Sequence, residues 1–90
     1  MFKTPKQLER HFKGVSNHRR IQILDLLYRN PALSLMEISK SLKANKKTIS
    51  EHTRRLQAAG LINKHYEGKK VLHELSPYGE RIYKFLATFK

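Results

Sequence analysis

The stretch NKKTISEHTRRLQAAG, residues 45 to 60, combines long cations, short hydroxyls and one carboxylate at helical spacing. Ile49, Thr53 and Leu56 are separated by four and three residues, so they share one face of a helix. The opposite side then carries most of the charge. Lysine and arginine bind phosphates, arginine also reaches the acceptor atoms of guanine, and a carboxylate accepts from the cytosine amino group. The stretch therefore has the chemistry to bind a nucleic-acid groove.

We call the charged side of this helix the reading face and predict that it contacts DNA. Its members are Lys46, Lys47, Thr48, Ser50, Glu51, Arg54 and Arg55. Thr48 lies near the helix start and could face either way. A uniformly cationic face would favour backbone binding alone, so the single carboxylate favours sequence reading. An equally good interpretation of Glu51 is an intrahelical ion pair with Lys47 or Arg55 at a spacing of four.

Two helices are predicted before this stretch. TPKQ provides Thr4 as N-cap, proline at the first position and a glutamine that completes a capping box, and Gly14 is predicted to mark the end of this helix. A second helix starts after Ser16 or Asn17 and runs through HRRIQILDLLYRN to the asparagine and proline at 30 and 31. Its apolar residues exceed what one face of a surface helix needs, which indicates a central helix.

A short third helix and a turn lead into the charged helix. Ser34 and Glu37 form a capping box ahead of an apolar pair, and the residues KAN then break the pattern. Asn45 is the predicted N-cap of the charged helix, and Gly60 suits the left-handed residue past its end. Two helices joined by a turn of about four residues match a helix-turn-helix, whose second helix enters the major groove.

After Gly60 the apolar period changes from helical to alternating. LINKHYEGKKVLHEL contains two short β-prone runs around EGKK, which predicts a β-hairpin with Gly68 in the turn. Val71, His73 and Leu75 alternate along the return strand, so one face can be buried. The hairpin tip is predicted to contact phosphates or the minor groove of DNA. The residues assigned to that contact are Lys64, Lys69 and Lys70.

The last helix starts at Ser76, with proline after it, and its apolar residues recur at helical spacing through the end of the chain. Together the first and last helices carry more apolar surface than the core of so short a chain absorbs, which favours burial against a second copy. The alternative is that both helices simply wrap one monomer. The predicted dimer interface consists of Leu8, Phe12, Ile82, Phe85, Leu86 and Phe89.

Composition agrees with a polyanionic partner. The chain of 90 residues has 19 basic and 7 acidic residues, a formal net charge of +12 and a pI near 10.3, which attracts polyanions. Residues 40 to 70 hold nine of the basic residues and only two acids, so the excess is greatest along the charged helix and the hairpin. This length suits one domain, residues 1 to 90.

Metal binding and catalysis are disfavoured. The chain has no cysteine, and its histidines lack the close helical pairing of a zinc site. We expect His52 to pack or hydrogen-bond beside the reading face, and His65 and His73 to lie near one another across the hairpin. Asp25 is the sole aspartate, and no glycine-rich loop could cradle a phosphate, so we expect neither an enzyme nor a cofactor.

The segment SLMEISKSLKANKKTISEHTRRLQAAGLI, followed by the hairpin and LSPYGERIYKFL, resembles a winged helix-turn-helix repressor of the ArsR type, with a wing similar to that of MarR proteins. SNHRRIQILDLL also resembles the ArsR helix that precedes the motif. The resemblance covers roughly residues 16 to 86 and implies a homodimer, built from the terminal helices, on an operator. Thr53 and Ala44 depart from the larger apolar residues usual in the family. The cysteine motif of metal-sensing members has no counterpart in SLMEISKSL.

The expected fold is mainly α with a small β-hairpin, a winged helix-turn-helix of about five helices. The expected function is sequence-specific binding of double-stranded DNA by a homodimeric transcriptional regulator. An architectural or chromatin protein that coats DNA without reading it is the alternative, and a module that docks on a protein is a third hypothesis. No apolar run is long enough to span a bilayer, and the N-terminus has no signal peptide, so we expect a cytoplasmic, nucleoid-associated protein.

Overall fold

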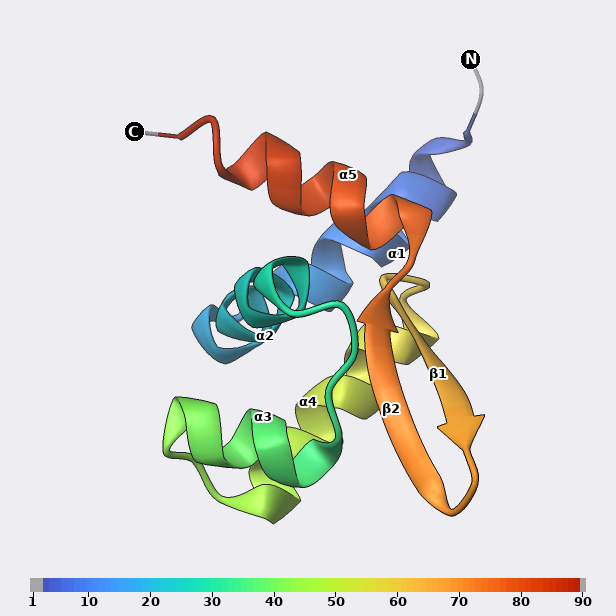
Figure 1. Ribbon diagram of the computed structural model, residues 1–90. Helices are drawn as coiled ribbons and strands as arrows, with labels where there is room; N and C mark the ends of the chain where they lie inside the picture. Colours follow the sequence, from blue (N-terminus) through green and yellow to red (C-terminus); the bar gives the residue numbers. More distant parts are fainter. Residues whose placement is uncertain (1–2, 90) are drawn as a thin grey trace.

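The computed structural model describes residues 3–89, which form five helices and one two-stranded sheet (Figure 1). In chain order the elements are α1 (Pro5–Val15), α2 (His18–Arg29), α3 (Leu35–Leu42), α4 (Lys46–Ala58), β1 (Ile62–Glu67), β2 (Lys70–Leu75) and α5 (Pro77–Leu86). This arrangement confirms the predicted fold class, a mainly helical chain with one β-hairpin between the fourth and fifth helices.

Every helix begins at a side chain that caps its first free N–H groups, which the first turn cannot satisfy internally. Thr4 and Ser34 form the two predicted capping boxes, in which the serine or threonine and the residue three positions later exchange hydrogen bonds. Asn45 accepts from the N–H groups of Lys47 and Thr48. Asn17, rather than Ser16, caps α2. Ser76 caps α5 as expected.

Of three predicted helix ends, one is off by a single residue, one is wrong and one is confirmed. Helix α1 ends at Val15, one residue after the predicted Gly14. A Cβ at Gly14 would overlap the Cβ of Ala59, so the glycine lets α1 approach α4 closely. The last helix stops at Leu86, where 3₁₀-type bonds, including Thr88 N–H to Phe85 O at 3.0 Å, close its final turn. Gly60 has the predicted left-handed conformation, with φ of 77°.

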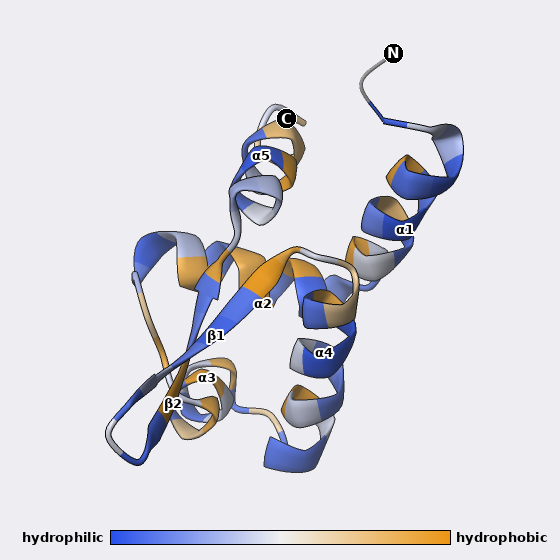
Figure 2. Cartoon of the chain, turned by 90° about the vertical axis from the view of Figure 1, so that its right-hand side faces the viewer, coloured by the Kyte–Doolittle hydropathy of each residue, from blue (hydrophilic) through white to orange (hydrophobic). Residues whose placement is uncertain are grey.

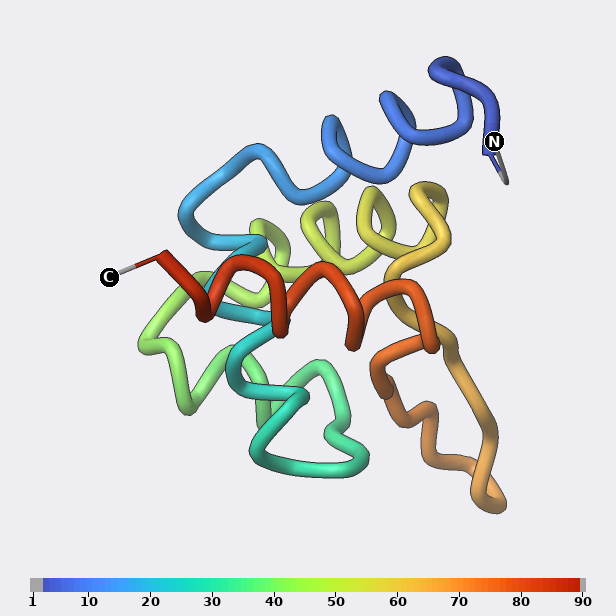
Figure 3. Tube along the Cα trace, turned by 90° about the horizontal axis from the view of Figure 1, so that it is seen from above, coloured from blue at the N-terminus to red at the C-terminus, as the bar shows by residue number. Residues whose placement is uncertain are grey.

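The core lies around α2, which contacts each of the other helices and β2. In the view from above, α1 lies beside α4 on one side of the molecule, and α5 crosses over α2 (Figure 3). The side chains that are completely buried come from α2, α3, α4 and the start of β1, and they form one cluster. They include Ile23, Leu24, Ile38, Ile49, Leu56, Leu61 and Ile62.

The hairpin pairs β1 with β2 in antiparallel register, with Lys64 opposite His73 and His65 opposite Leu72. Since neighbouring residues of a strand point to opposite faces, His65 and His73 lie on opposite sides of the hairpin. The expectation that they lie near one another is therefore wrong. His73 is buried and pairs with Leu33 through two backbone hydrogen bonds, which anchors the hairpin to the segment before α3.

Candidate nucleic-acid interface

The reading face of α4 is open to solvent along its whole length. All seven of its members are exposed, and Thr48 therefore faces outward with them. On the opposite side Ile49 and Leu56 are completely buried and Thr53 is 2% exposed, as the spacing predicted. The Thr53 hydroxyl donates to the Ser50 carbonyl at 2.9 Å, so this polar group is satisfied within the helix.

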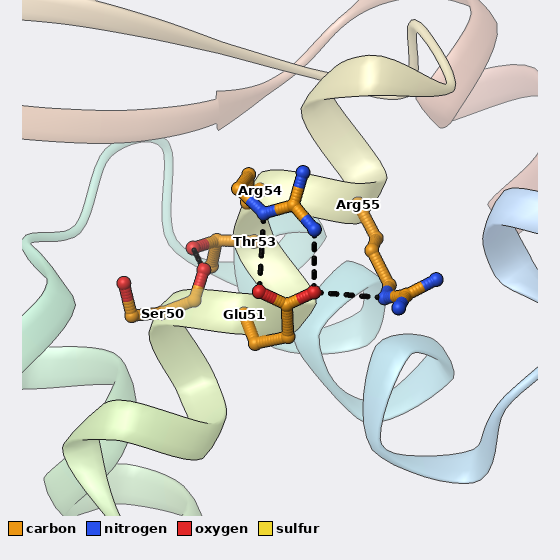
Figure 4. A network of polar contacts seen from close by, with 5 residues as sticks. All are labelled: Ser50, Glu51, Thr53, Arg54 and Arg55. Carbon is orange, nitrogen blue, oxygen red and sulfur yellow. Dashed lines mark hydrogen bonds and ion pairs between the residues drawn. The ribbon is translucent and has the colours of Figure 1, made fainter.

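Glu51 ties together the two arginines of the reading face (Figure 4). The Nε and Nη2 atoms of Arg54 donate to its two carboxylate oxygens at 3.0 and 2.6 Å, and Nε of Arg55 donates at 3.0 Å. The hydrogen bond from Arg54, together with its charge and Arg55, lowers the pKa of Glu51 to about 2. The predicted intrahelical ion pair between Glu51 and Arg55 is thus present in the structure. Arg54 is an additional partner, which was not predicted.

Three residues, from Lys43 to Asn45, join α3 to α4, and they are the KAN segment at which a break was predicted. Lys43 adopts a left-handed conformation with φ of 52°, which is uncommon outside glycine and turns the chain sharply. Arg19 reaches from α2 to the end of α3 and donates to the Leu42 carbonyl at 3.3 Å. The turn that sets the angle of α4 is therefore held by a contact from α2.

The hairpin forms a wing that projects away from the helical body (Figure 2). Its tip is hydrophilic, and the predicted contacts Lys64, Lys69 and Lys70 are all exposed. The wing and α4 diverge after the short connection between α4 and β1, so the charged tip lies apart from the reading face. DNA contact by these residues stays a prediction.

A second group of cations, which the sequence analysis missed, lies beside the C-terminal half of α4. We call it the α1–α4 hollow; its lining includes Gly14, Ala58, Ala59 and five cations: Arg10, Lys13, Arg20, Arg54 and Arg55. No sequence pattern indicated this grouping, because no local pattern shows that α1 lies against α4. The helical spacing of Arg10 and Lys13, three residues apart, was the one available signal.

The histidines serve separate structural contacts. His11 is buried against α4, where its Nδ1 donates to the Ala59 carbonyl at 2.7 Å, and its ring stacks on Tyr78. His65 bonds to Glu74 on the outer side of the hairpin at 2.8 Å. Within residues 3–89, no group of three or more His, Asp or Glu side chains could hold a metal ion.

The terminal helices carry an exposed apolar surface. Phe12 of α1 is 47% exposed and meets the ring of Phe85, which is 50% exposed, edge to face at 6.5 Å between centroids. Phe89 lies beyond α5 but packs edge to face on Phe85. The other members of the predicted dimer interface face the protein's own core to different extents. Leu8 and Leu86 are half-buried, and Ile82 belongs to the core cluster.

The arrangement of these elements defines the class of domain to which the chain belongs. A helix-turn-helix whose second helix is basic and exposed, followed by a wing with a basic tip, is a winged helix-turn-helix DNA-binding domain. The particular family follows from the sequence: the model of the bacterial regulatory proteins of the arsR family matches residues 17–64. The chain belongs to this family of DNA-binding transcriptional regulators.

Solved structures agree with this assignment. HlyU from Vibrio cholerae is 30% identical, with a TM-score of 0.85 over 98% of this chain and 96% of that chain. The homodimeric winged helix-turn-helix DNA-binding domain of a possible ArsR-family transcriptional regulator from Mycobacterium bovis is 26% identical, with a TM-score of 0.84 over 92% and 77%. The transcriptional repressor PagR of Bacillus anthracis, 23% identical with a TM-score of 0.83 over 90% and 93%, shares the fold. No curated protein sequence gives a significant match.

Within residues 3–89, no helix has the length and apolar character needed to cross a bilayer.

Proposed function

We propose that the protein is a sequence-specific, homodimeric transcriptional regulator that binds double-stranded DNA in the cytoplasm, on the nucleoid, without an enzymatic role or a cofactor. The observation that carries the proposal is the solvent-exposed reading face of α4. Its charged and hydroxyl side chains are exposed, while the opposite side of the helix is buried in the core. A helix of this kind fits the major groove, where base edges are distinguishable.

Sequence reading is supported by the mixed chemistry of that face. In the free protein, Glu51 accepts two hydrogen bonds from Arg54, so one orientation of the guanidinium is favoured before DNA arrives. A favoured orientation lowers the ordering entropy lost on binding. In this proposal the lysines at the start of α4 and at the wing tip hold phosphates, while Ser50 and Arg54 face the bases.

The terminal-helix surface supports the homodimer. Phe12, Phe85 and Phe89 expose aromatic rings that join into one patch, and such patches mark association sites. The M. bovis neighbour is a homodimer. A closed dimer with two-fold symmetry would present two copies of α4, which would then address two half-sites about 34–36 Å apart, or a multiple of that distance.

The decisive experiment is selection of bound duplexes from a random pool, followed by titration of the selected and a scrambled duplex at several salt concentrations. Sequence-specific binding predicts an enriched palindrome and a preference for it that persists as salt rises, since phosphate contacts weaken equally on both duplexes. Equal binding of both duplexes at every salt concentration would contradict sequence reading.

A second candidate is an architectural protein that coats DNA. The net charge of +12 favours it, because phosphate binding alone supplies non-specific affinity. Titration of a long duplex separates the two: coating gives a stoichiometry that grows with DNA length, whereas a regulator saturates its operator at one dimer.

A further inference from the structure

The α1–α4 hollow concentrates positive charge that the fold itself leaves uncompensated. Its volume is about 350 Å³. Two neighbouring carboxylates form ion pairs with three of its five cations. Glu9 approaches Lys13 only to 3.8 Å, with both side chains mostly exposed, and Glu51 is shared by Arg54 and Arg55. Arg10 and Arg20 form no ion pair within residues 3–89.

Two buried nitrogen atoms in this region lack a hydrogen-bond partner. They are Nε of Arg20 and Nδ1 of His52, and they are the two such side-chain atoms in the described part of the chain. Nε of Arg20 can only donate, and an unsatisfied buried donor is costly, which in native proteins often indicates a missing water or ion. The pKa of His52 is lowered, first by burial of the ring and then by the charge of Arg20, which agrees with an excess of positive charge here.

The position of the hollow relative to the wing suggests what fills it. The wing extends to one side of α4, whereas α1 lies beyond the C-terminal half of α4 on the other (Figure 2). In the close view, Arg55 points toward the segment that contains α1 and α2, while Ser50 lies on the opposite side of α4 (Figure 4). A helix about 10–12 Å wide fills a major groove about 12 Å wide, so each of its flanks meets one phosphate backbone.

We propose that the α1–α4 hollow binds a phosphate of the DNA backbone on the side of the major groove away from the wing, with Arg10 and Lys13 as its outer ligands. This inference rests on the proposed function, because its ligand is the DNA that α4 enters. It assigns α1 a role in DNA binding in addition to its packing: α4 is held between two phosphate contacts, one from the wing and one from α1 and α2.

The test measures the salt dependence of binding to a random-sequence duplex, since phosphate contacts need no particular sequence. Removing two phosphate ligands with R10Q/K13Q lowers the slope of log K against log salt by about 1.8 per protomer. R10K/K13R keeps both charges and retains the wild-type slope. The matched control R29Q/K84Q removes two exposed, ion-paired charges elsewhere and leaves the slope unchanged apart from a small uniform effect of net charge.

A second measurement needs no substitution and so does not depend on a variant folding. Lysine acetylation of the wild-type chain is followed by mass spectrometry with and without the duplex. The Lys13 side chain is 77% exposed in the free protein, so it is modified readily. The inference predicts that DNA protects Lys13 as well as Lys69 but leaves Lys84 reactive.

The outcomes separate this inference from the function on which it rests. A wild-type slope for R10Q/K13Q, or protection of Lys69 and Lys47 without Lys13, overturns the inference and leaves the proposed function intact. Protection of Lys13 by millimolar pyrophosphate but not by DNA also overturns it, and assigns the hollow to a free phosphate compound. Absence of any duplex binding by the wild-type chain at low salt overturns the proposed function, and with it the ligand named here.

Discussion

The reading face of α4 and the terminal-helix surface of α1 and α5 are both exposed, yet their chemistry is opposite. The reading face is charged, and the opposite side of the same helix is apolar and completely buried. The terminal-helix surface instead exposes aromatic rings beside a cavity of about 370 Å³. Charged side chains are stable in water and bind a polyanion by releasing counterions. Exposed phenylalanines gain only when another apolar surface covers them. Exposure alone therefore does not define a binding surface, because the chemistry of the surface selects the class of partner.

The largest expected effect is on the terminal-helix surface. Phe85→Asp places a charge in the centre of the aromatic patch, and we expect the dimer dissociation constant to rise about 100-fold, as for an aromatic hot spot. Sedimentation equilibrium measures this. Tyr66→Asp, at an exposed aromatic of the wing, is the matched control and leaves self-association unchanged. An unaltered dissociation constant for Phe85→Asp would show that the dimer forms through another surface, and measured wild-type mass at the monomer value would show that the terminal helices wrap one monomer.

On the reading face, Arg54→Ala has the next largest effect. We expect a loss of about 1–3 kcal/mol in preference for the selected duplex over a scrambled one, because the guanidinium that faces the bases is removed. Self-association stays at the wild-type level. Competition titrations give the preference, and Arg29→Ala, another arginine with an ion pair on its own helix, serves as control. An equal loss of affinity for both duplexes would show that Arg54 contacts a phosphate and not the bases.

The wing contributes less and without selectivity. Lys69→Ala is expected to weaken binding to every duplex similarly and to reduce the salt slope by about one, the signature of a single lost phosphate contact. Titrations of the selected and scrambled duplexes at several salt concentrations provide both quantities. Lys6→Ala, an exposed lysine of α1 outside the α1–α4 hollow, keeps the wild-type slope. A change in sequence preference on Lys69→Ala would contradict the division between base and phosphate contacts.

The smallest expected effect is on the free energy of unfolding, through the ion pairs of Glu51 and their loss at low pH. Its pKa is lowered from 4.5 to about 2, so the ionised carboxylate stabilises the folded state above about pH 4.5 and loses this contribution as the pH falls through about 2. Urea unfolding at several pH values should therefore show a small deficit for Glu51→Gln at pH 7 that disappears near pH 2. An equal deficit at both pH values would mean that the loss does not arise from the charge.

The start, the buried side and the end of α4 were all predicted from the sequence. Asn45, the apolar set Ile49, Thr53 and Leu56, and Gly60 each have a local role, so their types and spacing suffice to place the helix and its exposed side. The end of α1 was predicted to within one residue, but the role of Gly14 was not: it serves a contact with Ala59, 45 positions away in the chain, and not the local geometry that a helix-ending glycine satisfies.

The features of the candidate site also divide into those that local sequence predicts and those that depend on tertiary packing. The exposed side of α4 was predicted because helical periodicity alone determines it. The partner of Glu51 was only half predicted, since spacings of three and four are both in reach and rotamers decide between them. The α1–α4 hollow was missed because its cations come from three helices whose packing no local pattern encodes.

The helices, the hairpin and the side of α4 that faces water could be predicted from the amino-acid sequence, because each depends on residues within a few positions of one another, and the excess of positive charge is a property of composition. Three features required the packed structure: Ile82 belongs to the core, His65 and His73 face opposite ways, and α1 brings Arg10 and Lys13 beside Arg55. These depend on how separate elements pack, and packing is set by the shapes of surfaces that meet across the whole chain.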